Sequence, residues 1–283
     1  MPELPEVETV RRGLAPHLEG ARLARVVQNR PDLRFPLPED FVARLEGATI
    51  QALERRAKYL LARLDTGETL VAHLGMTGRF TVEETATGRF HHAAGADPKH
   101  THVVFETDGG ARIAFNDARR FGFMDLIRTD RLAEHPWFSA MGPEPLGPDF
   151  IPKALAAALA GRRQNIKVTL LDQKVVAGLG NIYVSEALHS AGISPERPAG
   201  ELTPKEIGKL VPAIRKTLEA AIEAGGASLR DYRQADGELG YFQHSFRVYD
   251  REEAPCPSQG CKGVIRRTVQ GGRSTFSCPV CQS

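Results

Sequence analysis

The stretch YLLARLDTGETLVAHL, residues 59–74, contains two short apolar runs separated by the turn-forming residues Asp65, Thr66 and Gly67. Runs of this length bounded by turn signals are typical of β-strands joined in a hairpin. Similar runs recur on both sides of this stretch, and no helical pattern separates them. The expected strands are 23–27, 49–53, 59–64, 69–74, 79–82, 102–106, 112–115 and 122–127. This spacing predicts an antiparallel sandwich or a flattened barrel.

The chain begins with MPELPE, residues 1–6, followed by an amphipathic run. Because Pro2 is small, we expect Met1 to be removed, which leaves a secondary amine that can form an iminium ion directly. A peptide α-amino group titrates near pH ~8, so about a tenth of it is neutral and nucleophilic at pH ~7. Glu3 and Glu6 can donate or accept a proton beside it. The hexapeptide is therefore a candidate Schiff-base nucleophile, although an ordinary helix start has the same pattern.

The composition is that of a globular protein, with 41% hydrophobic and 25% charged residues in 283. This length allows two or three compact units. No apolar run approaches the roughly 20 residues that span a bilayer. Acidic residues near the start argue against an export signal, so we expect a cytoplasmic protein. The net charge of +2 is too small to indicate a polyanionic partner by itself.

Beyond the predicted strands the pattern changes. Four prolines in residues 131–150 predict an interdomain linker. Helices are expected at 1–20, 152–160, 166–173, 181–191 and 204–224. Pro16 could bend the first helix, and Pro212 should kink or split the last. The polar segments 90–100 and 227–250 are expected to be loops.

All four cysteines lie near the end of the chain, as two close pairs: Cys256 with Cys261, and Cys278 with Cys281. This spacing is typical of a zinc ribbon. The runs 263–269 and 273–276 alternate like strands around Gly271-Gly272, which predicts a hairpin. Zinc would stabilise a segment too short for its own core, and four thiolates leave no open position, so the ion would be structural. Two disulfides are the alternative, which a cytosolic location disfavours.

The cysteine module is locally basic. From residue 256 to the end it carries four basic residues and no acidic one: Lys262, Arg266, Arg267 and Arg273. Such a field on a small module favours nucleic acid, although a solvated charged surface has the same composition. Arg273, at the expected hairpin tip, is the candidate phosphate contact.

Two further segments carry residues suited to a distorted duplex. Residues 117–122 place two arginines and an aromatic at a strand end, and residues 73–78 place Met76 between glycines. Met, Phe and Arg side chains can wedge into DNA and fill the gap left by an extruded base. The alternatives are that Met76 and Phe121 pack in the core, and that Arg119 forms an ion pair with Asp117.

Two other features allow several interpretations. Lys58 follows two arginines, which we expect to lower the pKa of its amine and so to suit it to proton transfer or phosphate binding, although most such lysines are solvated. Residues 178–183 form a glycine turn that runs into a helix. The start of a helix can bind phosphate, but an ordinary helix–helix turn has the same sequence.

Taken together, these residues resemble the formamidopyrimidine-DNA glycosylases, bacterial base-excision repair enzymes for oxidised purines. The matching motifs are 2–9, 55–60, 73–76, 119–122, 178–183, 229–232 and the four-cysteine module. The resemblance spans the chain. It implies an α+β fold with a β-sandwich domain and N-terminal helix, a helix–two-turn–helix domain and a terminal zinc-ribbon hairpin. We expect domains at 1–130, 151–245 and 246–283, with a linker at 131–150.

The resemblance also implies residue roles. Pro2 would attack the anomeric carbon of the sugar and Glu3 would protonate the ring oxygen. Met76, Arg119 and Phe121 would fill the void left by the flipped base. The implied catalytic set is Pro2, Glu3, Lys58 and Arg273, and the implied DNA contacts are His73, Met76, Arg119, Arg120, Phe121, Lys167, Asn181 and Tyr241. Residues 228–242 match the loop that closes over the flipped base.

The implied chemistry is base excision followed by β,δ-elimination, by a monomer on double-stranded DNA, with one structural zinc ion and no redox cofactor. The nearest alternative is the related endonuclease type that prefers oxidised pyrimidines. Leu4 favours the purine type, because the pyrimidine type usually has glycine there. A zinc-ribbon DNA-binding protein without catalysis is the alternative from another class.

Overall fold

The structure is a computed structural model that describes residues 2–84, 97–227 and 240–283. Contacts between Cα atoms divide the chain into two compact units. The first comprises Met1–Ser139 and Ala224–Tyr241, and the second Ala140–Glu223 and Phe242–Ser283. The predicted domain boundaries at 130, 150 and 245 stay a prediction.

The first unit is built from two four-stranded antiparallel sheets, in the orders β1-β6-β7-β5 and β2-β3-β4-β8. The strands are β1 (Leu23–Gln28), β2 (Ile50–Arg56), β3 (Tyr59–Leu64), β4 (Glu68–His73), β5 (Arg79–Glu84), β6 (Thr101–Thr107), β7 (Ala111–Asn116) and β8 (Phe123–Arg128). All eight predicted strands are confirmed, with most bounds shifted by no more than a few residues. The strands β3 and β4 form the predicted hairpin, in which Leu60 lies opposite Ala72.

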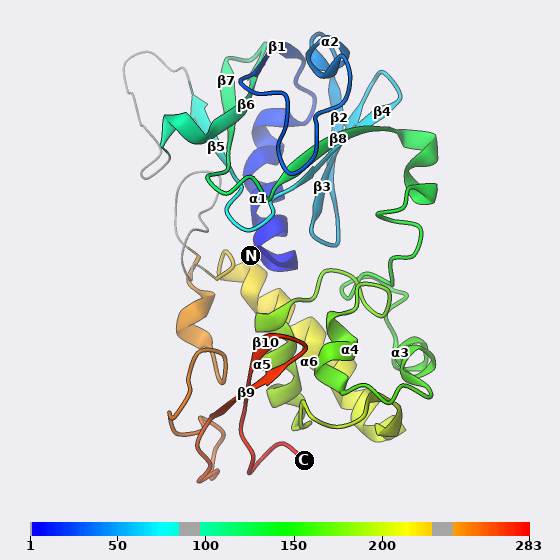
Figure 1. The fold of residues 1–283 in the computed structure, drawn as a ribbon, viewed down its shortest axis with the longest axis vertical. Coiled ribbons are helices and arrows are strands. Elements are labelled where there is room, and N and C mark those ends of the chain that lie inside the picture. Colours follow the sequence, from blue (N-terminus) through cyan, green and yellow to red (C-terminus); the bar gives the residue numbers. More distant parts are fainter. Residues whose placement is uncertain (1, 85–96, 228–239) are drawn as a thin grey trace. The chain divides into compact units, whose positions relative to one another are not determined.

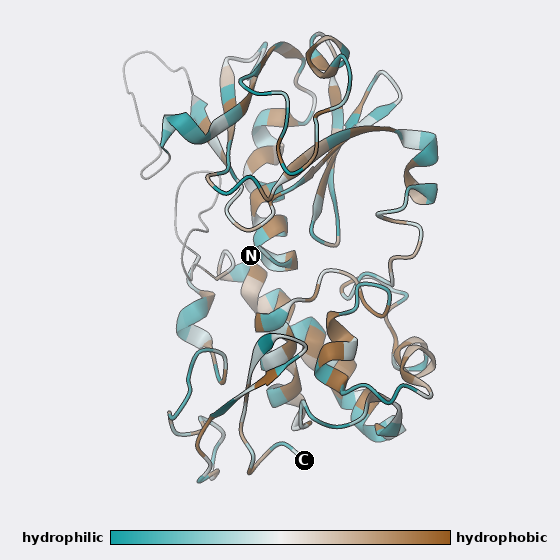
Figure 2. Cartoon of the chain, viewed as in Figure 1, coloured by the Kyte–Doolittle hydropathy of each residue, from teal (hydrophilic) through white to brown (hydrophobic). Residues whose placement is uncertain are grey.

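Helix α1 (Leu4–Leu18) supplies the centre of this unit's core. Its buried residues Leu4, Val7, Val10, Leu14 and Leu18 recur every three or four positions and so share one face. One hydrophobic cluster joins this face to side chains of both sheets. Figure 1 shows a sheet on either side of α1, and Figure 2 shows hydrophobic and hydrophilic residues alternating along it. The unit is therefore a sandwich, and the short helix α2 (Phe41–Leu45) adds to the same core.

The second unit is helical. It contains α3 (Pro152–Leu159), α4 (Ile166–Leu171), α5 (Asn181–Ala191) and α6 (Pro204–Glu223), and α6 packs against α3 and α5. The four predicted helices are confirmed within two residues. Fully buried Leu170 and Leu188 illustrate why these segments pack, since each lies on the apolar side of its helix.

The expected split of the last helix at Pro212 is wrong, because α6 runs unbroken through this residue, while a kink there stays a prediction. A proline within a helix removes one hydrogen bond and crowds the residue four positions earlier. Here that residue is Gly208, whose Cα faces open space, and both residues are exposed. The carbonyl that loses its partner can therefore bind water. Helix α1 likewise continues two residues past Pro16.

The predicted hairpin near the end of the chain is confirmed as β9 (Arg266–Gln270) and β10 (Arg273–Ser277). The turn residues Gly271 and Gly272 have φ angles of 55° and 72°, which only glycine adopts without strain. The module has almost no apolar core. Its buried cluster comprises Val248, Cys256, Ile265, Phe276 and Cys278, and two of these five residues are cysteines.

The remaining described segments contain short 3₁₀ turns: Pro98–His100, Thr129–Glu134, Ala199–Glu201 and Phe242–Ser245. The predicted linker 131–150 has no α-helix or strand. Much of the loops expected at 90–100 and 227–250 lies outside the described residues. Within the described part of the chain, every helix is too short or too polar to cross a bilayer.

Candidate active site and nucleic-acid interface

The candidate nucleophile lies immediately before the start of α1. Glu3 is the N-cap residue of the helix, and Pro5 in its first turn already has the φ angle of a helix. The Glu6 carboxylate accepts hydrogen bonds from the N–H groups of Glu3 and Ala227, each at 2.8 Å. Both carboxylates are buried, Glu3 at 3% exposure and Glu6 at 2%.

Lys58 lies in the two-residue turn between β2 and β3 and is only 8% exposed. Ala57 in this turn has a φ angle of 54°, a left-handed conformation that costs about 1–3 kcal/mol for a residue other than glycine. Arg55 holds the turn, because its Nη1 donates to the Ala57 carbonyl at 3.0 Å. Its Nε donates to the Glu8 carboxylate on α1 at 3.2 Å. The lysine is thus tied to the helix that begins at the candidate nucleophile.

His73 ends β4 as a neutral hydrogen-bond donor. Its Nδ1 accepts from the Gly75 N–H at 3.0 Å, so the ring proton is on Nε2. The ring stacks on Phe123, with centroids 5.0 Å apart. Burial, and then the positive charges of Lys58 and Arg34, lower the pKa of His73 from 6.5 to about 4. At neutral pH this side chain can therefore bind a phosphate through Nε2–H, without carrying a charge of its own.

We expect NMR titration of His73 to give a midpoint near its pKa of about 4, below the ordinary value of 6.5. The unfolded chain takes up this proton more readily than the folded chain. The contribution of neutral His73 to stability is therefore complete above pH 6.5 and is lost as the pH falls from there through about 4. Lys58→Met removes one of the two charges and should raise the midpoint. A midpoint near 6.5 in the unsubstituted protein would contradict this account.

Met76 and Phe121 are exposed, although both are large and apolar. Met76 is 39% and Phe121 42% exposed, so the alternative that they pack in the core is wrong. The Arg119 guanidinium lies 4.7 Å from the centroid of the Phe121 ring, in a cation–π arrangement. The backbone N–H of Arg119, and not its guanidinium, contacts the Asp117 carboxylate, at 3.3 Å. The side chains of Met76, Arg119 and Phe121 therefore remain available to a ligand.

A cavity of about 400 Å³ beside these residues is lined by arginine. Its lining residues are Leu33, Arg34, Arg119, Arg120 and Phe121. Arg120 has a φ angle of 55°, again left-handed for a residue that is not glycine. Three guanidinium groups around one cavity create a positive potential suited to phosphates.

In the second unit, Lys167 and Asn181 both hold the hairpin. Lys167 is fully buried, and its Nζ donates to the Ser274 carbonyl at 3.2 Å and to Thr275 Oγ1 at 2.9 Å. Asn181, the first residue of α5, donates to the same Ser274 carbonyl through Nδ2 at 2.8 Å. Arg273, the preceding residue of the hairpin, is exposed. Lys167 and Asn181 thus fix the strand that presents Arg273, and their direct contacts to DNA stay a prediction.

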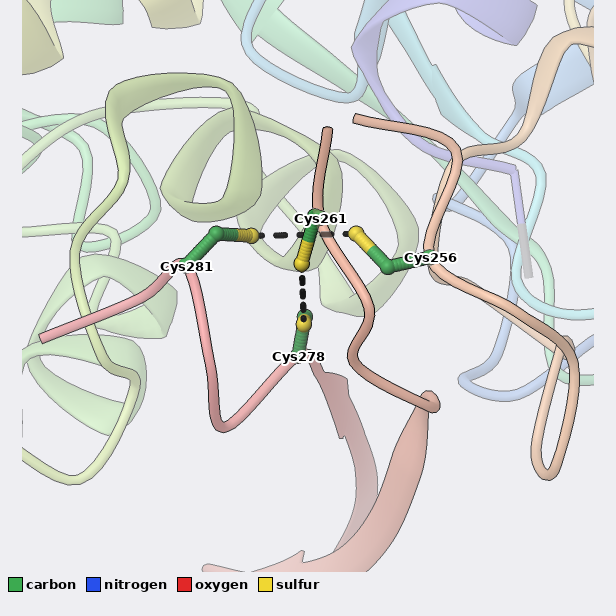
Figure 3. Close-up of side chains that lie close together, drawn as sticks. All are labelled: Cys256, Cys261, Cys278 and Cys281. Atoms are coloured by element: carbon green, nitrogen blue, oxygen red, sulfur yellow. Dashed lines mark hydrogen bonds between the residues drawn. The ribbon is translucent and has the colours of Figure 1, made fainter. Parts of the chain in front are cut away.

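The four cysteines gather into one cluster, in which all four Sγ atoms lie within 4.8 Å of one another. Figure 3 joins two pairs of sulfur atoms by dashed lines, Cys256 with Cys281 at 3.7 Å and Cys261 with Cys278 at 3.6 Å. A disulfide needs about 2.05 Å, so the disulfide alternative does not fit. Four thiolates about 2.3 Å from a tetrahedral zinc ion lie about 3.8 Å apart. The cluster therefore fits one zinc ion, and four sulfur ligands leave it no position for a substrate.

Sequence reasoning missed Glu186 on α5, which anchors the segment leading to the cysteines. It is 3% exposed, and its carboxylate accepts from three consecutive backbone N–H groups. These donors are Arg247 at 2.9 Å, Val248 at 3.0 Å and Tyr249 at 2.8 Å. No local pattern could have indicated this contact, because its partners lie about 60 residues away.

His189, one turn further along α5, was missed for the same reason. Arg247 Nε donates to its Nδ1 at 3.4 Å, which places the ring proton on Nε2. That nitrogen lies 3.5 Å from Cys256 Sγ and 3.3 Å from Ser258 Oγ. A donor in this position orients a thiolate and stabilises its charge.

Two remaining site predictions concern the first unit. Tyr241 is 58% exposed, and its N–H donates to the Ala224 carbonyl at 2.9 Å. The loop expected to cover a flipped base lies, from 228 to 239, outside the described residues. Its predicted role is therefore still a prediction.

Comparisons with known proteins identify the family. Residues 1–124 match the model of the formamidopyrimidine-DNA glycosylase N-terminal domain, and residues 141–233 match the H2TH domain of the same glycosylases. The formamidopyrimidine-DNA glycosylase of Caulobacter sp. (strain K31) is 64% identical over all of both chains.

Solved structures agree with this assignment. The MutM (Fpg) protein of Thermus thermophilus has a TM-score of 0.85 at 41% identity, over 99% of this chain and 98% of that one. The Lactococcus lactis Fpg, in a complex with DNA containing an abasic site, has a TM-score of 0.87 at 34% identity over all of both chains. These matches cover both units of the fold and the sequence motifs described above, so the chain belongs to the formamidopyrimidine-DNA glycosylase family.

Proposed function

We propose that this chain excises oxidised purines, such as 8-oxoguanine and formamidopyrimidines, from duplex DNA and then cleaves the strand. The observation that carries the proposal is the position of Pro2, directly before a helix start at which the carboxylates of Glu3 and Glu6 are buried. A terminal secondary amine beside a proton donor suits attack on a sugar carbon. The relatives named above support the substrate class.

The proposed reaction proceeds in four steps. A base within the stack is out of reach, so the damaged nucleotide is first extruded. The Pro2 nitrogen then bonds to the anomeric carbon, the base leaves with the electrons of its glycosidic bond, and protonation of the ring oxygen by Glu3 opens the sugar to an iminium ion. The iminium acidifies the adjacent carbon, so the two phosphates leave in turn by β- and δ-elimination. Water finally releases Pro2.

We assign the other residues by the groups that they present. Lys58 and His73 supply a buried ammonium group and a neutral N–H donor for the sugar–phosphate backbone of the lesion. Met76, Arg119 and Phe121 enter the duplex at the space left by the base. Contacts from Arg120, Lys167, Asn181 and Tyr241 belong to the same proposal, as does closure of the loop 228–242 over the base.

We propose that the cysteine cluster holds one structural zinc ion. The ion would stabilise the hairpin that carries Arg273, while the chemistry stays with Pro2 and Glu3. The proposed partner is double-stranded DNA. A monomer can bind it, because the candidate contacts of the first unit and those of the second belong to one chain. Since the relative in Caulobacter is bacterial, we place this activity in the bacterial cytoplasm.

Borohydride trapping tests the proposed function. The protein is incubated with a duplex containing 8-oxoguanine in the presence of borohydride, which reduces an iminium to a stable amine. A covalent protein–DNA adduct that maps to Pro2 is expected. A DNA-binding protein without catalysis gives no adduct, and a higher yield on oxidised thymine than on oxidised guanine would assign the chain to the pyrimidine type.

We expect Arg273→Ala to weaken binding to duplexes of any sequence and to lower the slope of log K against log salt concentration by about 0.9, because one phosphate contact is lost. Titrations at several salt concentrations measure this slope. Arg131→Ala, which removes an exposed arginine paired with Glu134, is the control and should leave the slope unchanged. An unchanged slope for the Arg273 variant would remove this residue from the phosphate contacts.

A further inference from the structure

Two loops of the first unit carry Met76, Arg119 and Phe121. One follows β4 and leads into β5, and the other joins β7 to β8. Two of the three side chains are apolar yet well exposed, at 39% for Met76 and 42% for Phe121. Exposed apolar side chains tend to fold back onto the surface, so keeping them available for insertion requires loops whose backbone is fixed.

A single buried carboxylate fixes both loops. Asp117 is fully buried and begins the second loop. Its Oδ2 accepts from the Gly122 N–H at 2.7 Å, at the end of that loop, and its Oδ1 accepts from the Arg119 N–H at 3.3 Å. Its Oδ1 also accepts from the Thr77 hydroxyl, which belongs to the first loop. Thr77 Oγ1 in turn accepts from the Arg119 N–H at 3.2 Å, so the two loops share donors and acceptors.

The backbone of Asp117 is held as firmly as its side chain. Its N–H donates to the His100 carbonyl at 3.0 Å, and its carbonyl oxygen lies 2.7 Å from Nε2 of buried His102. The backbone of Asp117 is therefore fixed, and its carboxylate accepts hydrogen bonds from both loops. A buried carboxylate surrounded by N–H and O–H donors is a stable anchor, because each hydrogen bond that it accepts is strengthened by its negative charge.

The two loops also meet backbone to backbone. Gly75 has a φ angle of 62°, and a Cβ atom added there would lie 2.2 Å from the carbonyl carbon of Phe121. A Cβ at Gly122 would lie 2.9 Å from the His73 carbonyl oxygen and 3.0 Å from Asp117 Oδ2. There is no space for a side chain at either glycine, so the loops cannot shift independently.

The same carboxylate leaves the Arg119 side chain available. Asp117 directs its charge to backbone N–H groups and a hydroxyl, and the guanidinium stacks on Phe121 instead. Among the described residues, no carboxylate forms an ion pair with that guanidinium. The acid thus positions the arginine without neutralising it.

We propose that Asp117 is a positioning residue for base extrusion: it holds Met76, Arg119 and Phe121 in register so that they enter the duplex together. The inference rests on the proposed function, because it assigns these three side chains to the space left by the base. It predicts that a substitution of Asp117 slows the extrusion of a stacked base more than it slows the chemistry at Pro2.

The test is Asp117→Asn. This substitution keeps the shape of the side chain but replaces one acceptor oxygen with an NH₂ group, which faces the N–H of Gly122 or of Arg119 and cannot accept from it. Single-turnover base release is measured on a duplex containing 8-oxoguanine, and borohydride trapping on a duplex with a preformed abasic site, which has no base to extrude. We expect base release to slow by about tenfold or more, since a buried donor loses its acceptor. Trapping at the abasic site should stay close to the rate of the unsubstituted protein.

Asp108→Asn is the matched control, because Asp108 lies in an exposed turn of the same sheet, where its Oδ1 accepts from the Arg22 N–H at 3.2 Å. Its rates should be unchanged on both substrates. Thr77→Val removes one donor to Asp117 and should cause the same split between substrates with a smaller effect. This second variant carries the test if the first does not fold.

Equal rates for the substituted and unsubstituted proteins on the 8-oxoguanine duplex would overturn the proposal. An equal loss on both substrates would also overturn it, because it would indicate general damage to the fold. Failure of the unsubstituted protein to form an adduct on either substrate would instead refute the proposed function.

Discussion

Replacing Pro2 with glycine is expected to lower the rate of base excision by at least about a hundredfold, while binding to duplex DNA stays close to that of the unsubstituted protein. Glycine offers a primary amine, whose iminium can lose its remaining N–H proton and become a neutral imine, whereas the proline iminium keeps its positive charge and is the stronger electron sink. The helix start should survive, because Glu6 still accepts the Glu3 N–H and Pro5 still occupies the first turn. Single-turnover excision and equilibrium binding, measured on the same duplex, separate the two effects.

A second variant distinguishes loss of the amine from disturbance of the helix. Inserting one lysine between Met1 and Pro2 blocks removal of the methionine and leaves the proline nitrogen as an amide. All original side chains remain, so binding should persist while borohydride trapping disappears. Full activity of this insertion variant, or an adduct that maps to a lysine, would place the nucleophile elsewhere. Loss of binding in Pro2→Gly would assign Pro2 a structural role instead.

Replacing Cys278 with serine is expected to abolish zinc binding and to unfold the segment from about residue 246 to the end. The buried cluster of this segment contains only three apolar side chains besides its cysteines, Val248, Ile265 and Phe276. So few buried apolar side chains do little to offset the entropy lost when the segment becomes ordered. The folded state of the segment should therefore depend on the metal, as in other small metal-dependent modules.

Zinc content and hydrogen exchange measure this effect directly. The Cys278→Ser protein should contain almost no zinc, exchange its hairpin amides rapidly and lose duplex affinity, because Arg273 is no longer held in place. Ser277→Ala, which changes the neighbouring residue outside the cluster, should keep both the metal and the protection. A Cys278→Ser protein with a protected hairpin and no zinc would contradict the structural role of the metal.

Much of the fold could be predicted because the deciding signals are local. The two apolar runs of residues 59–74 and their turn define a hairpin within one short window, and the other strands follow the same rule. The cysteine spacing and Gly271-Gly272 likewise define a hairpin without knowledge of the rest of the chain. Pro212 was the exception, since its effect depends on Gly208 and on solvent around the helix, which the rule for proline does not include.

The sequence by itself determined the element types, the family motifs and the set of chemically capable residues: a proline next to the initiator, its acids, and four cysteines in two pairs. These depend on residue type and short spacing, which the chain carries before it folds. Only the tertiary structure decided how those residues are held. It buried Lys167 against the Ser274 carbonyl, turned Asp117 toward the backbone of two loops, and placed His189 beside Cys256. Such contacts join residues that are distant in sequence or depend on a loop's conformation, so they arise from packing and burial, which no local pattern encodes.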